Sequence, residues 1–114
     1  MGTDFPESDW RAFRKLREIA LERFCERVVT NLNRIAADAD LAYHSRYRSI
    51  YELIQERDRE LADAFDNPRR STALFQLALM VSFDLVADEE LRMFTAGTRS
   101  LVQSLVKPGN GTNR

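Results

Sequence analysis

Residues 71–86, STALFQLALMVSFDLV, carry apolar side chains on almost every side of any helix they form. At about 100° per residue they make two opposed stripes, with Leu74, Leu77, Val81 and Leu85 on one and Phe75, Leu79 and Val86 on the other. A helix that is apolar all round has to be covered by lipid, by the rest of the chain or by another molecule.

Lipid is the weakest of these three answers. A membrane-spanning helix needs ~20 predominantly apolar residues, whereas this run is shorter, contains Asp84 and is followed directly by the acids of DEE. The chain begins MGTDFPESDWR, which lacks the apolar core of a secretion signal, and it has a single cysteine, Cys25. We therefore predict a cytoplasmic protein that makes no membrane contact.

Four further segments have helical signatures. Asp4, Pro6 and Glu7, with Ser8 as an alternative cap, are typical of a helix start, and the apolar residues that follow recur at three- and four-residue steps to about residue 37. A second helix is predicted from about 41 to 65, capped by Asp38 or Asp40, and the apolar helix follows with Ser71 or Thr72 as its cap and an end near residue 86. DEELRMF (88–94) and TRSLVQSLV (98–106) predict two short helices.

These segments predict an all-α fold: a four- to five-helix bundle with a long antiparallel helical hairpin, a central apolar helix and short C-terminal helices. At 114 residues the chain fits one domain, with residues 1–6 as an N-terminal arm and 107–114 as a disordered tail.

One hairpin and a short C-terminal segment offer little material to enclose the apolar helix. We therefore expect a homodimer, with another protein partner as the alternative. The candidate interface residues are Leu74, Leu77, Val81, Leu85, Phe94 and Leu101.

Charge is balanced along the chain, with 17 basic and 18 acidic residues and a net charge of −1. The predominance of arginine over lysine is typical of a GC-rich, bacterial-like genome. Glu18, Glu22 and Glu26 share one flank of the first helix and the other flank carries arginines, so the acidic flank predicts a basic neighbour from the second helix or from another protomer. Balanced charge and an apolar third helix argue against a nucleic-acid-binding protein.

The carboxylates of the two long helices are candidates for metal-dependent chemistry. Glu60 and Asp63 form an ExxD that resembles half of the acidic pattern of helical nucleotide pyrophosphohydrolases, in which ExxE on one helix faces ExxD on the next. The first helix offers only ExxxE spacings. The helical spacing of Glu56, Glu60 and Asp63 leaves a metal-dependent phosphohydrolase as a further alternative.

Other chemistry has less support. The only histidine, His44, has no ExxH partner set of the ferritin-like kind and no assignable catalytic neighbour. Cys25 lies on the apolar side of the first helix, where burial makes a thiol inert. The sequence predicts no catalytic residues, no metal and no cofactor.

The leading hypothesis is therefore a small non-enzymatic protein-interaction or regulatory module. The alternative is a small-molecule-binding bundle. Its candidate pocket residues are Trp10, Phe13, Phe24, Tyr47, Tyr51 and Phe75.

Overall fold

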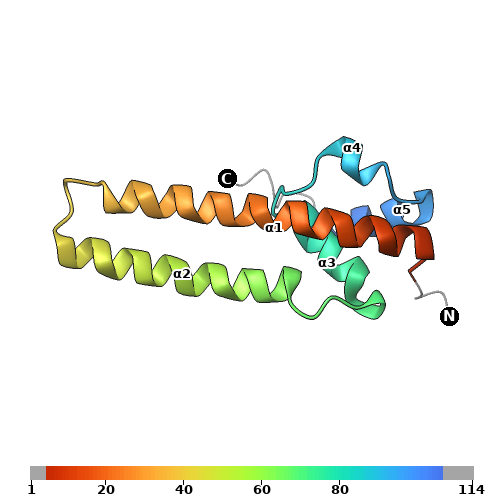
Figure 1. Cartoon of the computed structure of the whole chain (residues 1–114), viewed down its shortest axis with the longest axis horizontal. Helices are drawn as coiled ribbons and strands as arrows, with labels where there is room; N and C mark the ends of the chain where they lie inside the picture. Colours follow the sequence, from red (N-terminus) through yellow and green to blue (C-terminus); the bar gives the residue numbers. More distant parts are fainter. Residues whose placement is uncertain (1–4, 107–114) are drawn as a thin grey trace.

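The computed structural model describes residues 5–106, and the all-α fold predicted from the sequence is confirmed. Its elements are α1 (Glu7–Ala36), α2 (Tyr43–Phe65), α3 (Arg70–Ser82), α4 (Asp88–Leu91) and α5 (Ala96–Leu105). The molecule is elongated, measuring 55 × 28 × 22 Å, because α1 and α2 form a long antiparallel hairpin and the other helices gather at one end of it (Figure 1). We call residues 25–63 the arm and the end that carries α3–α5 the base.

The N-cap residues of α1 and α2 differ from those predicted from the sequence. Pro6 occupies the N-cap position of α1 without a side-chain hydrogen bond, and Ser8 lies inside the helix; Asp4 lies outside the described residues. Ala42 is the N-cap residue of α2 and supplies no side-chain cap. The Asp38 carboxylate instead accepts a hydrogen bond from the Asp40 backbone N–H (3.0 Å), so the aspartates organise the loop and do not cap α2.

The apolar helix α3 is shorter than predicted at its C-terminal end. Asp84 adopts a left-handed conformation with φ of 60°. The Leu85 N–H bonds to the Met80 carbonyl and the Asp84 N–H to the Val81 carbonyl, each at 2.9 Å. This pair of bonds is a Schellman motif, which ends a helix at Ser82 although the apolar pattern continues. At the other end Arg69 is the N-cap residue, so neither Ser71 nor Thr72 caps the helix.

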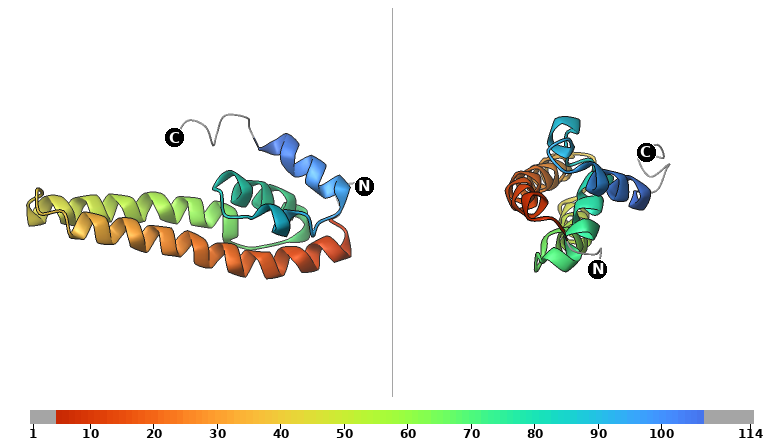
Figure 2. Two further views of the ribbon diagram at one scale, coloured as in Figure 1. Left: turned by 90° about the horizontal axis from the view of Figure 1, so that it is seen from above. Right: turned by 90° about the vertical axis from the view of Figure 1, so that its right-hand side faces the viewer.

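The core lies at the base, where α3 packs against α1, α2 and α5 (Figures 1 and 2). Leu77 and Met80 of α3 are fully buried, and they meet Phe13 of α1, Phe65 of α2 and Val102 of α5 in one cluster. Of the large apolar side chains on α3 only Phe75 is strongly exposed, at 64%. The single chain therefore encloses this helix far better than the sequence suggested.

A buried carboxylate joins the two ends of the chain at the base. Asp9 of α1 is fully buried, and its Oδ1 accepts a hydrogen bond from the Thr95 N–H (2.9 Å). Its Oδ2 accepts from the hydroxyls of Thr95 (2.7 Å) and Thr98 (2.5 Å). Asp9 thus binds the first turn of α5, where free N–H groups and the helix dipole favour a negative charge.

Arginine side chains close the C-terminal ends of several helices. Arg17 donates from Nε (3.0 Å) and Nη2 (2.6 Å) to the carbonyl of Phe65, the last residue of α2. Arg46 donates to the carbonyl of Ala36, the last residue of α1 (3.1 Å). Because the last carbonyls of a helix lack partners within it, these bonds satisfy acceptors that would otherwise need water.

Candidate functional site

The arm is the part of the structure that is not enclosed. Every fully buried residue of α1 lies at or before Phe24, and α2 buries only Ala64 and Phe65. No residue of the arm is buried, and the arm extends away from α3–α5 as a two-helix layer (Figure 2). The seam between its helices, which includes Val28, Leu32 and Ile50, is only half-buried.

An apolar stripe runs along the outer surface of α2 in the arm. Tyr43, Tyr47 and Tyr51 are 83%, 67% and 56% exposed, and Ile54 continues the stripe. Steps of four and three residues place all four side chains on one side of the helix. The His44 ring stacks on Tyr47 with centroids 6.5 Å apart, and the Arg46 guanidinium lies over Tyr43.

This stripe faces away from the base helices. Tyr51 and Glu60 are nine residues apart, or about two and a half turns, so they point to opposite sides of α2, and Glu60 lines a cavity beside the end of α3. On α1, Val29 is 54% exposed and lies nine residues from the fully buried Ala20. Val29 is seven residues before the end of α1 at Ala36, and Ile50 is seven residues after the start of α2 at Tyr43. Val29 therefore lies beside Ile50 along the hairpin, at about the level of the next residue, Tyr51. We call Val29, Tyr43, Tyr47, Tyr51 and Ile54 the arm face.

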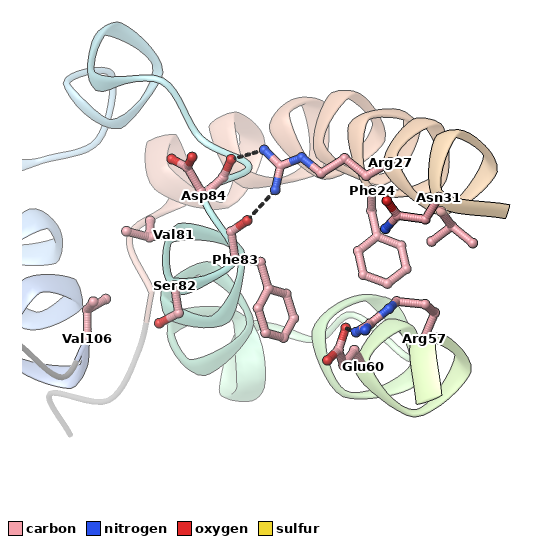
Figure 3. A pocket seen from close by; sticks show the side chains of 11 residues that line it. Phe24, Arg27, Asn31, Arg57, Glu60, Val81, Ser82, Phe83, Asp84 and Val106 are labelled. Carbon is pink, nitrogen blue, oxygen red and sulfur yellow. Dashed lines mark hydrogen bonds and ion pairs between the residues drawn. The ribbon is translucent and has the colours of Figure 1, made fainter. Parts of the chain in front are cut away.

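The cavity, about 640 Å³, lies on the other side of the hairpin, between its helices and the end of α3 (Figure 3). Both arginines that line it already have partners. Arg27 donates to the carbonyls of Phe83 (2.6 Å) and Asp84, and Arg57 donates to Glu60 (2.5 Å). The apolar part of the wall comes from Phe24, Val28, Val81, Phe83 and Val106.

The six predicted pocket residues do not line one cavity. Phe24 alone borders the cavity beside α3. Trp10 stacks on Phe13 in the core, with ring centroids 5.7 Å apart. Tyr47 and Tyr51 lie on the arm face and Phe75 lies exposed on α3, because these rings are on helix sides that no other part of residues 5–106 covers.

The six predicted interface residues are divided between core and surface. Leu77, Leu85 and Phe94 are buried within the chain. Leu74 and Val81 are half-buried, and Leu101 is exposed on α5. The exposed apolar surface with the clearest pattern lies on the arm, which the sequence argument did not single out.

The acidic residues considered for metal chemistry are arranged around a basic side chain. Arg57 lies between Glu56 (3.6 Å) and Glu60 (2.5 Å). Asp63 is exposed. Among residues 5–106 no group of three or more His, Cys, Asp or Glu side chains is placed to hold a metal ion, and no helix there is both long and apolar enough to cross a bilayer.

Arg23 and Glu90 form a bidentate ion pair that the sequence did not predict. Arg23 Nη1 and Nη2 donate to the two oxygens of Glu90 at 2.7 and 2.8 Å, and Nη1 also donates to the Leu85 carbonyl (2.8 Å). The hydrogen bond from Arg23 is the main cause that lowers the pKa of Glu90 below its ordinary value; burial acts against it, and the Ala87 N–H adds to it. The same pair raises the pKa of Arg23.

Arg23 and Arg27 of α1 therefore stabilise the fold and do not pair with the acidic flank of the same helix. Arg23 and Arg27 turn toward the α3–α4 connection, where carbonyls and Glu90 accept their hydrogen bonds. Within the described chain Glu18, Glu22 and Glu26 form no ion pair. The predicted basic neighbour for this flank is thus not supplied by the described part of α2.

Comparison of the chain with family models, with curated proteins and with solved structures gives no match.

Proposed function

We propose that this protein is a non-enzymatic interaction module whose arm docks onto another helical protein surface. The observation that carries the proposal is the arm itself, because residues 25–63 form a two-helix layer without a buried residue, while the base is well packed. Three exposed tyrosines on one side of α2 supply large, rigid contact area with a polar hydroxyl, which is a composition that protein interfaces favour.

An amphipathic helix or hairpin is the partner surface that fits. Such a partner would lay its apolar side along the tyrosine stripe of α2 and complete a bundle around the half-buried seam. The exposed rim of the arm carries both signs, for example Arg48 and Asp58, so the partner needs a mixed-charge rim and not a strongly charged one.

Site-specific photo-crosslinking tests this proposal. A photoreactive phenylalanine analogue replaces Tyr47 on the arm face or, as the matched control, Phe75, which is equally aromatic and 64% exposed but lies on α3. We expect position 47 to give a discrete crosslinked species that excess unmodified protein competes away, and position 75 to give none. Equal labelling from both positions, or none from position 47, would contradict an arm-based docking function.

The cavity beside α3 favours a second candidate function, the binding of a small molecule. Its lining combines two basic residues, Arg27 and Arg57, with two acidic ones, Glu60 and Asp84, around the Phe24 and Phe83 rings. The charges balance, so a neutral amphipathic ligand fits best. A thermal-shift screen with the Ser82→Phe variant, which fills the cavity, tests this idea: a ligand of the cavity stabilises the unmodified protein and not the variant. A stabilising ligand that acts equally on both would place binding elsewhere.

A further inference from the structure

The occupant of the arm face can be specified further, and this step rests on the proposed docking function. We infer that the arm face binds a second copy of this chain, so that two hairpins stack through their arm faces into a four-helix bundle. The homodimer interface expected from the sequence on α3 is thus proposed on the arm, because the chain itself covers most of α3.

The area of the arm face fits a pair of identical faces. A tyrosine side chain buries roughly 200 Å², so Tyr43, Tyr47 and Tyr51 at their exposed fractions offer roughly 400 Å² per copy. Val29 and Ile54 raise the total for two copies to roughly 1,000 Å², which is about the least that a specific interface needs. The surrounding rim adds to this area when two whole arms meet.

The shape of the arm also suits a second copy. The two antiparallel helices of the arm form a layer, and an identical layer stacked on the arm face covers the seam residues Leu32 and Ile50 from that side and completes a four-helix arrangement. The base helices do not obstruct this arrangement, because they pack on the opposite side of the hairpin from Tyr51 and Val29.

The charges around the arm face are compatible with self-pairing. Arg48, Glu26 and Asp58 form no ion pair within residues 5–106. In a two-fold interface, residue i of one copy meets residue j of the other and the reverse holds as well. A rim with unpaired charges of both signs can therefore be complemented by a rotated copy of itself.

Sedimentation velocity and light scattering on the full chain test this inference. We expect a species of twice the 13.2 kDa monomer mass at micromolar concentration. Tyr51→Glu and Val29→Glu should each weaken dimerisation by at least about tenfold, because a desolvated charge at a buried contact costs more than 1.4 kcal/mol. The matched controls are Phe75→Glu on α3 and Ile19→Glu on α1, both exposed apolar residues outside the arm, and both should leave the dimer intact.

The outcomes separate the two proposals. A monomer at all concentrations, or a dimer that Phe75→Glu disrupts and Tyr51→Glu does not, overturns the second copy as the occupant. If the chain is a monomer but position 47 still crosslinks to a discrete protein, docking through the arm stands and the partner is a different helical protein. Circular dichroism showing helical content equal to that of the unmodified chain excludes unfolding as the cause of any loss.

Discussion

The buried carboxylate of Asp9 accepts three hydrogen bonds from residues far away in the sequence. Its partners Thr95 and Thr98 are 86 and 89 residues from it. Nothing local in the sequence marks it, because acids in the first turn of a helix are ordinary and its partners Thr95 and Thr98 are distant. The same holds for Arg23, whose partner Glu90 is 67 residues away. Helical periodicity reports only neighbours within a few turns, so contacts of this kind lay beyond prediction.

Replacing Asp9 should cost stability at the base. Asp9→Ala leaves the Thr95 N–H, the Thr95 hydroxyl and the buried Thr98 hydroxyl without their acceptor, and we expect the free energy of unfolding to fall by about 3 kcal/mol. Asp9→Asn, which keeps one acceptor oxygen, should lose less. Urea denaturation measures both, with the exposed neighbour Ser8→Ala as the control. Equal stability of Asp9→Ala and the control would show that the network contributes nothing.

The Glu90–Arg23 pair predicts a specific dependence of stability on pH. Since the folded state lowers the pKa of Glu90, its stabilising effect is fully present above the ordinary glutamate value of about 4.3 and is lost as the pH falls through the lower folded value. The difference in urea midpoint between the unmodified chain and Glu90→Gln should therefore be largest near neutral pH and shrink in acid. A constant difference from pH 7 to pH 2 would contradict the assigned shift.

At the scale of the helices, the sequence predicted most elements well. The three- and four-residue apolar steps located α1 and α2 to within a few residues, because a long amphipathic pattern is the strongest signal of a helix. The end of α3 was misplaced by about one turn, since an apolar run does not report a Schellman motif and Asp84 is not the glycine that usually marks one. The caps were also wrong, at Ala42 and Arg69, where backbone geometry operates without a side-chain cap.

The left-handed Asp84 gives a prediction about this helix end. Asp84→Gly should raise the free energy of unfolding by about 0.5–1 kcal/mol, because glycine adopts a positive φ without steric cost. Asp84→Ala should lower it, since alanine has the steric cost without the local hydrogen bonding that aspartate can make. Differential scanning calorimetry of the pair tests the assignment, and a glycine variant as destabilised as the alanine variant would contradict it.

At the scale of the whole molecule, the question raised by residues 71–86 has a divided answer. The chain itself covers most of α3, so the base is closed, whereas the arm has no buried residue. The sequence could not show this, because Tyr43, Tyr47 and Tyr51 at four-residue spacing are equally compatible with a core edge and with an exposed stripe. Only the packing of α3 on the opposite side of the hairpin distinguishes the two.

The most direct test of the central claim, that the arm is completed by another copy, is amide hydrogen exchange measured at a dilute and at a concentrated condition. Regions with few buried contacts open easily, so the arm should exchange faster than the base when the protein is dilute. On concentration, the amides of residues 25–63 should become protected while those of α3 and α5 do not change. Exchange in the arm that is the same at both concentrations, or protection that appears in α3 and α5 instead, would contradict this account.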